Sequence, residues 1–277
     1  MDEKKQPRIK ILVACHKADP NIRQDDIYMP IQVGKALHPE LDLGFQCDNT
    51  GDNISEKNES YCELTALYWA WKNLKDVDYI GLCHYRRYFY LKDKRIFSND
   101  KIILPYFKIL PTNVMDNLSM WTSLEDCYIL FDSIISLYPE YRKSVVEYYL
   151  KGNAFSLCNM FIAPVEIFNS YCSFLFTVLG KIETKIKMYP FTRQNRLIGY
   201  LAETLLGLWI LHNHIPHNHV YFDGCVGFSN VLKTKIGNIR NKMSFFCATS
   251  NNRPNKLIMS APVSVGFQQD AFIIENI

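Results

Sequence analysis

The chain has 277 residues, with 31 Lys and Arg against 28 Asp and Glu, so its formal net charge at pH 7 is only +3. This balance excludes a strongly basic protein that coats nucleic acid and a chain dominated by an acidic tail. Hydrophobic residues make up 48% and charged residues 21% of the sequence. Such a composition forms a large buried core and excludes disorder as the main state.

The sequence shows neither the pattern of a secreted protein nor that of a membrane-spanning one. The apolar run 11–15 is too short for a signal-peptide core, and the richest apolar stretch, 168–180, is interrupted by Asn, Ser and Thr. The 9 cysteines are an odd number without a Cys-x-x-Cys pair, and we interpret them as reduced core thiols. We therefore expect a cytoplasmic protein.

The first predicted element is a buried strand. Residues 9–15 form a short, branched, apolar run after a charged leader, and His16 and Lys17 follow at its C-terminal end. Residues 42–58 are rich in Asp, Asn, Gly and Ser, which is typical of a loop.

A helix and a second strand come next. Ser60 and Glu63 have the spacing of a capping box, and apolar side chains recur at helical spacing over 64–71. The run 79–83 predicts another buried strand, which leads directly into the polar and aromatic segment 84–89.

The middle of the chain is less regular. Over 92–138 we expect a short strand at 102–104 and otherwise an irregular, aromatic insertion that suits a lid or an acceptor side. Pro139 is predicted to start a helix that ends near Gly152, and 155–163 is predicted to be a buried strand that one polar residue, Asn159, interrupts.

Two long helices are predicted after that strand, from Pro164 and over 199–211, and strands and loops are expected from His212 onward. Because predicted strands alternate with helices, we expect an α/β fold with a mostly parallel sheet. Ligands of such sheets bind in the crevice at the carboxyl ends of the strands.

The segment 84–89 is the main candidate for chemistry. Arg86 and Arg87 lie where a buried strand ends, among an imidazole and aromatic rings. Guanidinium groups bind phosphate oxygens in a bidentate manner, so two of them would balance a diphosphate. The alternative is that both arginines pair with Asp48, Asp52 or Glu63.

No phosphate-binding glycine loop, nucleophile elbow or His-Glu-x-x-His motif is present. Instead, the chain carries a set of unusual strings in a fixed order. They are Tyr28–Gly34, Asp48–Ser55, Tyr61–Asn73, His84–Phe89, Asn159–Phe161 and Ala202–Glu203. On these strings, from about residue 9 to about residue 215, the chain resembles a bacterial glycosyltransferase family that was long catalogued as a domain of unknown function and is found in capsule and O-antigen gene clusters.

The resemblance implies a single GT-A-like domain, which we place at residues 1–230, with residues 231–277 as a C-terminal extension packed on it. It also implies transfer of a hexose from a nucleotide-sugar, expected to be a UDP-sugar of the galactose type, to a glycan acceptor in surface polysaccharide biosynthesis. The alternative is a non-catalytic nucleotide-sugar or carbohydrate binding protein that retains the fold.

Many GT-A enzymes place Asp-x-Asp at the end of a buried strand, where it holds a divalent metal. Here that place holds His84, Tyr85 and Arg86, and Asp76 and Asp78 lie before the strand, at the wrong end. We therefore expect Arg86, together with Arg87, to stabilise the leaving diphosphate without a metal cofactor, with Mn²⁺ or Mg²⁺ as the alternative.

The remaining candidate residues are assigned by their positions in these motifs. The expected donor-binding residues are His16, Lys17, Asp52, Asn53, His84, Tyr85, Arg86 and Arg87. The rings of Tyr85 and Tyr88 are expected to stack on a base or sugar. For Asp52 and Asn53 the alternative is a local turn, and for His16 and Lys17 it is a plain strand exit.

On the acceptor side we expect Asn159 and Met160, although Asn159 could instead bond to neighbouring backbone. Glu203 lies among apolar neighbours, which would raise the pKa of an unpaired carboxyl and suit a catalytic general base. Its alternative is a buried ion pair with Arg86, Arg193 or Arg196.

The expected partners are a nucleotide-sugar donor and a glycan or lipid-linked saccharide acceptor. Peripheral contact with the inner membrane is expected through four basic residues, Lys233, Lys235, Arg240 and Lys242. No nucleic acid partner is expected, because the chain is nearly neutral. His212, His214, His217 and His219 invite a metal site, but a polar loop is the preferred interpretation.

Overall fold

The computed structural model of the chain describes residues 6–91, 96–187, 194–223, 228–249, 256–259 and 272–275. The chain forms two compact units. The first comprises Met1–Tyr106, Cys158–Ser173 and Ile215–Val226, and the second comprises Phe107–Leu157, Phe174–His214 and Gly227–Ile277. The division expected at residue 230 stays a prediction, and helix α8 (Phe228–Thr249) runs across that position.

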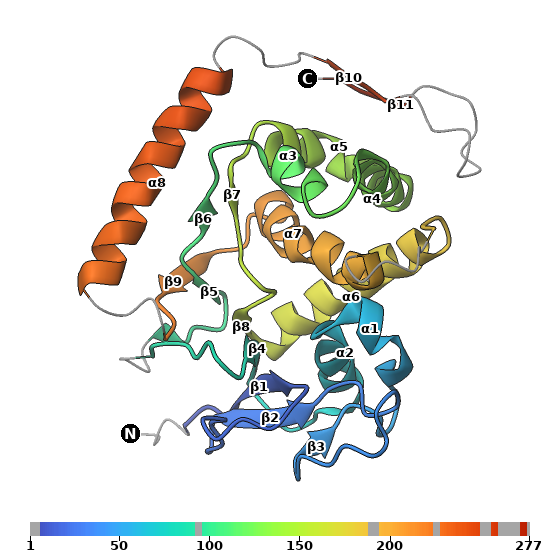
Figure 1. Ribbon diagram of the computed structural model, residues 1–277, viewed down its shortest axis with the longest axis vertical. Helices are drawn as coiled ribbons and strands as arrows, with labels where there is room; N and C mark the ends of the chain where they lie inside the picture. The colour runs from blue at the N-terminus through green and yellow to red at the C-terminus, as the bar shows by residue number, and fades with distance from the viewer. Residues whose placement is uncertain are drawn as a thin grey trace. The chain divides into compact units, whose positions relative to one another are not determined.

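A seven-stranded sheet forms the centre of the first unit in the part of the chain that is described, with the order β3-β2-β1-β4-β8-β5-β9 (Figure 1). Its strands are β1 (Ile9–Cys15), β2 (Tyr28–Gln32), β3 (Gln46–Cys47), β4 (Tyr79–His84), β5 (Ile102–Pro105), β8 (Phe161–Pro164) and β9 (His217–Val220). Strand β8 is antiparallel to β4 and β5, and the other neighbouring pairs are parallel. The α/β fold with a mostly parallel sheet is therefore confirmed.

The central position of β1 explains its apolar sequence, because an internal parallel strand is covered on both faces. Alternate side chains of β1, among them Ile11 and Val13, enter a core cluster with Tyr85, Tyr88 and Phe89. Successive side chains of a strand point to opposite faces. The segment that follows β4 therefore folds back over one face of the sheet and covers it.

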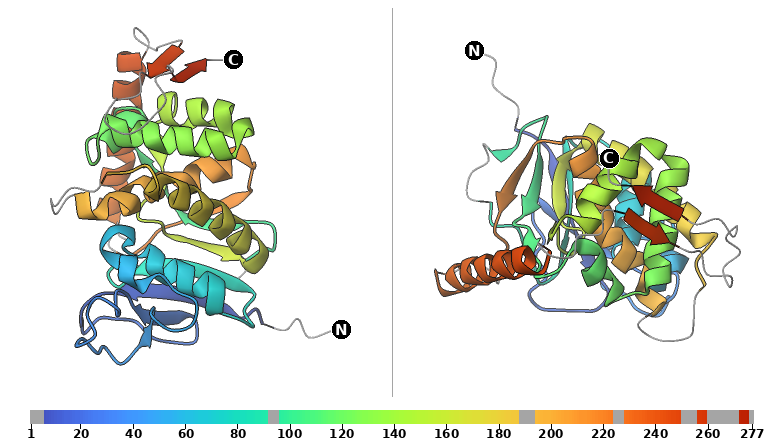
Figure 2. Two further views of the ribbon diagram at one scale, coloured as in Figure 1. Left: turned by 90° about the vertical axis from the view of Figure 1, so that its right-hand side faces the viewer. Right: turned by 90° about the horizontal axis from the view of Figure 1, so that it is seen from above.

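Helices cover the other face. Phe161, on β8, packs its ring against Phe168 and Tyr171 in the first half of α6 (Val165–Glu183). Helix α2 (Leu64–Asn73) lies along the strands, as Figure 2 shows. Both faces of the sheet are thus covered. A ligand site is therefore expected in the loops at the ends of the strands.

The helix predicted from Ser60 is broken in the structure. Helix α1 (Asn58–Tyr61) follows a 3-10 turn at Ser55–Lys57 and ends at Cys62, whose φ of 52° interrupts the helical path before α2 begins. The predicted capping box is wrong, because no side chain caps α2. Glu63 makes a different bond, described below.

The strand predicted over 155–163 is also wrong in its middle. Strand β7 (Ala154–Phe155) ends early and β8 starts only at Phe161, because Cys158 and Asn159 have φ values of 61° and 51°. Two consecutive left-handed residues cannot continue a strand, and of the two residue types only Asn adopts this conformation readily.

The second unit is mainly helical. Its helices are α3 (Val114–Ser119), α4 (Leu124–Leu137), α5 (Arg142–Val145), the second half of α6, α7 (Leu197–His212) and α8. Short 3-10 helices lie at Pro139–Tyr141 and Gln194–Arg196, and Val146–Leu150 forms a π-helix. Two small ladders join β6 (Lys108–Ile109) to β7 and β10 (Lys256–Met259) to β11 (Phe272–Glu275).

Two further parts of the chain differ from the prediction. The expected irregular insertion contains α3 and α4, and α4 begins with a capping box in which Ser123 and Asp126 bond to each other's backbone N–H. The expected strands and loops after His212 include β9, but α8 is a long helix. Helix α8 lies beside β6 and apart from the other helices of this unit (Figure 1).

Candidate functional site

The strand order of the first unit marks where a ligand is expected. Strand β1 is followed in the chain by β2 on one side, whereas β4 pairs with β1 on the other side. The strand order therefore changes sides between β1 and β4, which makes this position the switch point of the sheet. The carboxyl ends of the strands at a switch point frame the ligand crevice in open α/β sheets.

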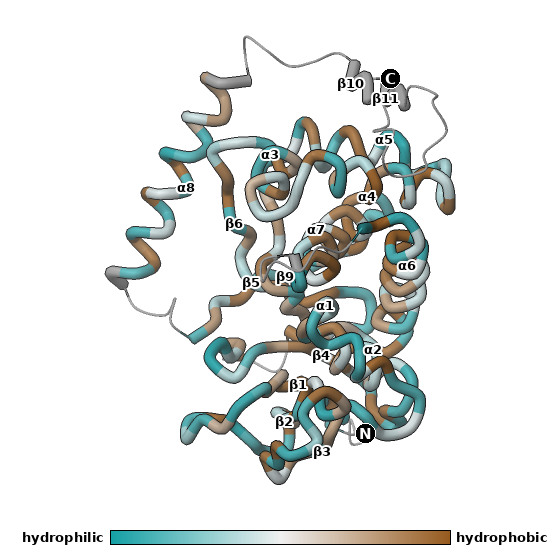
Figure 3. Tube along the Cα trace, turned by 45° about the vertical axis from the view of Figure 1, so that its right-hand side comes forward, coloured by the Kyte–Doolittle hydropathy of each residue, from teal (hydrophilic) through white to brown (hydrophobic). Residues whose placement is uncertain are grey.

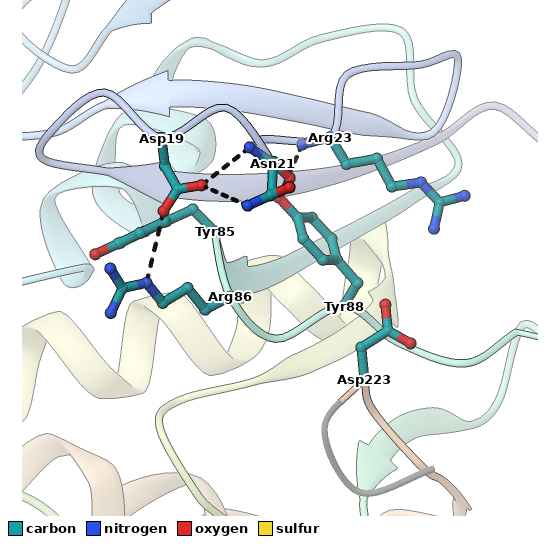
Figure 4. A pocket seen from close by; sticks show the side chains of 7 residues that line it. All are labelled: Asp19, Asn21, Arg23, Tyr85, Arg86, Tyr88 and Asp223. Carbon is teal, nitrogen blue, oxygen red and sulfur yellow. Dashed lines mark hydrogen bonds and ion pairs between the residues drawn. The ribbon is translucent and has the colours of Figure 1, made fainter. Parts of the chain in front are cut away.

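A pocket of about 640 Å³ opens beside these strand ends, a size within the range of small-molecule sites of roughly 300–1,000 Å³. Its lining comes from the segments that follow β1, β4 and β9, as Figure 4 shows. The lining residues are Asp19, Asn21, Arg23, Tyr85, Arg86, Tyr88 and Asp223.

Asp19 and Arg86 face each other across this pocket. The Asp19 carboxylate accepts bonds from the backbone N and the Nδ2 of Asn21, at 2.9 and 3.2 Å, and lies 3.7 Å from Arg86 Nε. The Asn21 backbone N–H and then its amide and Arg86 lower the pKa of Asp19. The Asp19 side chain is only 14% exposed, whereas that of Arg86 is 64% exposed. Arg86 therefore presents its charge to solvent.

Aromatic rings form the rest of the pocket wall. The Arg86 guanidinium lies 5.0 Å from the centre of the Tyr85 ring. Tyr88 Oη accepts a 2.8 Å bond from the Arg23 backbone N–H, and partial burial raises the pKa of Tyr88. The pocket thus combines two guanidinium groups, two carboxylates, an amide and two phenol rings.

The structure brings two of the predicted donor-binding residues, Tyr85 and Arg86, into this pocket. His16 lies next to it, with its ring 5.5 Å from Tyr85 in an edge-on arrangement. Lys17 is exposed in the segment after β1.

His84 and Arg87 lie together on a neighbouring turn. His84 Nε2 lies 2.9 Å from the carbonyl oxygen of Cys158, and Arg87 Nη1 donates to Cys158 Sγ at 3.3 Å. The Arg87 backbone N–H bonds back to the His84 carbonyl at 2.8 Å. This tight turn points the two arginines to different neighbours, and Arg87 is not among the lining residues of the pocket.

Asp52 and Asn53 make local bonds. Asn53 Oδ1 accepts from the Ser55 N–H at 3.2 Å and its Nδ2 donates to the Gly51 carbonyl at 2.9 Å. Asp52 Oδ1 accepts from Tyr68 Oη at 3.2 Å. These bonds are those of a polar turn fixed to α2, and neither side chain lines the pocket.

The predicted acceptor and base residues lie elsewhere. Asn159 is buried and donates to Glu63, and Met160 is fully buried in the core cluster of the first unit. Glu203 is half-buried on α7 of the second unit and has interaction partners. The roles predicted for these three residues stay predictions.

No cluster of three or more His, Cys, Asp or Glu side chains is arranged to hold a metal ion in the described part of the chain. Asp19 and Asp223 are the pocket carboxylates that could contribute to one. Asp76 and Asp78 lie before β4 and pair with Arg8, with 3.3 Å between Arg8 Nη2 and Asp78 Oδ1. As for membrane spans, we find no helix among the described segments that is both long and apolar enough to be one.

Sequence reasoning missed Asp19, Asn21, Arg23 and Asp223. The sequence did contain a signal for Asp19, Asn21 and Arg23. Residues 19–26 are mostly polar and follow the predicted strand 9–15, just as Arg86 and Arg87 follow the predicted strand 79–83. Asp223 follows β9, a strand of mixed polarity. Nothing in its local sequence distinguishes it from a surface loop residue.

The fold is that of an α/β protein with a mostly parallel sheet and a pocket at the carboxyl ends of its strands. The chain itself is a member of the family described as a domain of unknown function, DUF4422, whose model matches residues 10–214. It is similar to a solved structure described as the apo structure of WbbM, a bifunctional glycosyltransferase.

The identity to WbbM is 28% and the TM-score is 0.71, over 77% of this chain and 45% of that chain. The present chain therefore spans less than half the length of WbbM. A search of curated proteins finds no match.

Proposed function

We propose that the chain is a glycosyltransferase that moves a hexose from a UDP-sugar of the galactose type to a glycan acceptor in capsule or O-antigen biosynthesis. The observation that carries the proposal is the pocket at the switch point of the sheet, where Arg86 and Tyr85 lie side by side. The similarity to a protein described as a bifunctional glycosyltransferase supports the same activity.

The chemistry of the pocket suits a nucleoside diphosphate. The rings of Tyr85 and Tyr88 offer apolar faces to a base or sugar. The carboxylates of Asp19 and Asp223 accept hydrogen bonds from hydroxyl groups such as those of ribose. Arg86 supplies a fork of N–H donors that matches phosphate oxygens.

Arg86 is free to change partners at low cost. Its contact with Asp19 is long, at 3.7 Å, and its side chain is 64% exposed, so solvent screens the pair and it contributes little to stability. Hydrogen bonds to a charged group contribute about 1.5–3 kcal/mol. A diphosphate therefore outcompetes Asp19 for the guanidinium.

In the transfer step, the bond between the anomeric carbon of the sugar and the diphosphate oxygen breaks, and the acceptor oxygen bonds to that carbon. The electron pair of the broken bond leaves with UDP, and Arg86 stabilises the charge that develops there. The acceptor hydroxyl loses its proton to a general base, for which Glu203 is our prediction. His16, Lys17, Asp52, Asn53, His84 and Arg87 remain predicted donor contacts.

We further propose that Arg86 replaces the metal cofactor, with Mn²⁺ or Mg²⁺ held by Asp19 and Asp223 as the alternative. UDP release from a panel of UDP-hexoses, measured in EDTA with and without a glycan acceptor, tests both claims. Turnover in EDTA is the expected result. Loss of turnover in EDTA that Mn²⁺ restores contradicts the metal-independent step.

The same assay separates an enzyme from a binding protein, because a transferase slowly hydrolyses its donor even without an acceptor. Binding of UDP-sugars without any UDP release would contradict the enzyme and support a non-catalytic nucleotide-sugar binding protein. A thermal-shift screen of UDP, GDP, dTDP and CMP sugars identifies the donor. A ligand at 100 times its dissociation constant raises the free energy of unfolding of the protein by about 2.7 kcal/mol.

A further inference from the structure

Helix α8 carries an exposed apolar stripe that the sequence analysis did not anticipate. Five large apolar side chains in its described part are between 44% and 69% exposed: Leu232, Ile236, Ile239, Met243 and Phe246. Their spacing alternates between four and three residues, so at about 100° per residue they fall within roughly 80° of the helix circumference. Figure 3 shows the resulting alternation of hydrophobic and hydrophilic segments along α8.

The stripe faces away from the side of α8 that packs on its own unit. Asn241 Nδ2 donates to the Ile109 carbonyl of β6 at 2.8 Å, and Phe245 is buried. These residues lie on the opposite half of the helix from the centre of the stripe. Packing against the described residues of the second unit therefore does not account for the stripe.

Basic residues flank the stripe on both sides. Lys235 and Lys242 lie along one edge and Lys233 and Arg240 along the other, by the same helical periodicity. Residues 228–249 contain no Asp or Glu. An apolar face with cations along both edges is the pattern of a helix that lies in a membrane interface, with its apolar side chains among the acyl chains and its cations at anionic headgroups.

A second copy of the chain fits this surface poorly. The stripe has the spacing of the core positions of a coiled coil, and the four basic residues then occupy the flanking positions that face the partner helix. In a homodimer these positions would oppose like charges, which disfavours pairing.

We propose that α8 is an interfacial helix that docks the protein on an anionic lipid surface through this stripe and its four flanking cations. The proposal does not depend on the glycosyltransferase activity, because docking requires neither donor nor acceptor. It extends the membrane contact expected from the four cations alone by naming the apolar side chains that would insert.

Sedimentation with lipid vesicles tests the proposal with the full chain. We expect the protein to sediment with vesicles of phosphatidylcholine and phosphatidylglycerol in equal parts, and far less with pure phosphatidylcholine or at high salt. The variant Ile236→Asn/Ile239→Asn/Met243→Gln keeps the net charge and is expected to lose binding more than tenfold. The variant Lys235→Ser/Lys242→Ser is expected to lose roughly fivefold per cation.

The matched control Lys75→Ser/Lys143→Ser removes the same charge from exposed positions outside α8 and is expected to bind as the wild type does. Circular dichroism of each variant checks that the helix content is retained. Wild-type protein that stays in the supernatant with the anionic vesicles, or a stripe variant that sediments like the wild type, overturns the proposal. So does a lipid-free dimer that the stripe variant converts to a monomer.

Discussion

The side-chain amide of Asn159 donates a 2.9 Å hydrogen bond to Glu63 Oε1, across 96 positions of sequence. Both residues are buried, with 1% and 8% exposure. The bond holds the left-handed turn at Cys158 and Asn159, and Cys158 in turn contacts His84 and Arg87. Glu63, which the sequence analysis assigned to a helix cap, therefore helps to hold the segment that carries Arg86 in place.

We expect Asn159→Gly to lower the free energy of unfolding by about 1.5–3 kcal/mol, because the variant leaves the Glu63 carboxylate without its buried donor. Asn159→Ala should cost about 1–2 kcal/mol more, since Ala resists the left-handed conformation and Gly does not. Urea unfolding of both variants measures the difference. Equal stabilities would show that the turn is not held in this conformation.

Arg86→Ala should weaken UDP binding roughly 10- to 150-fold, which corresponds to the loss of one charge-assisted contact. Arg87→Ala should have a smaller effect, because Arg87 contacts Cys158 and does not line the pocket. Arg86→Lys should recover part of the affinity, since it restores the charge without the fork. Equal losses for Arg86→Ala and Arg87→Ala would instead support a two-arginine clamp.

Asp25 gives a prediction for acid stability. Partial burial raises the pKa of Asp25, but the backbone N–H groups of Tyr28 and Ile27 and the Arg23 guanidinium outweigh it, so the net pKa is lowered. A carboxyl whose pKa is lower in the folded than in the unfolded protein stabilises the fold at pH values above the unfolded pKa, which is about 4. This contribution is lost as the pH falls through the pKa of the folded protein.

Asp25→Asn should therefore be less stable than the wild type at neutral pH, and the two should converge in acid. Urea midpoints between pH 7 and about pH 3 measure the convergence. A constant gap across this range would mean that the charge of Asp25 makes no contribution.

Gly81 lies in β4, where a Cβ would come within 2.9 Å of the Phe161 carbonyl oxygen and of Ile162 Cγ1. Gly81→Ala should lower the stability by about 1–3 kcal/mol through overpacking. Gly180→Ala is a control of opposite sign, because its Cβ meets nothing within 4 Å and Ala is favoured in helices by about 1 kcal/mol. Thermal unfolding compares the two, and a stable Gly81→Ala variant would contradict the tight fit of β4 against β8.

The parts of the fold that were predictable are those with a strong local signal. Strands β1 and β4 are apolar runs, and α6 and α7 are long apolar helices, so each is specified by its own residues. Helix α8 was missed because its mean hydropathy is low and Gly237 lies in its middle, although the apolar spacing was present.

The candidate site was predictable only in part. Tyr85 and Arg86 were found because they follow a recognisable strand. Asp19, Arg23 and Asp223 come from two other loops, and their meeting depends on the order of strands in the sheet. The bond between Asn159 and Glu63 depends on two left-handed residues, and a local pattern does not encode such a long-range contact.

Calorimetric titration of UDP into the protein in EDTA tests the central claim most directly, with wild type and Arg86→Ala in parallel. We predict that the wild type binds UDP without a divalent metal and that Arg86→Ala binds at least about tenfold more weakly. Identical affinities for both proteins, or binding that arises only after Mn²⁺ is added, would contradict the role given to Arg86.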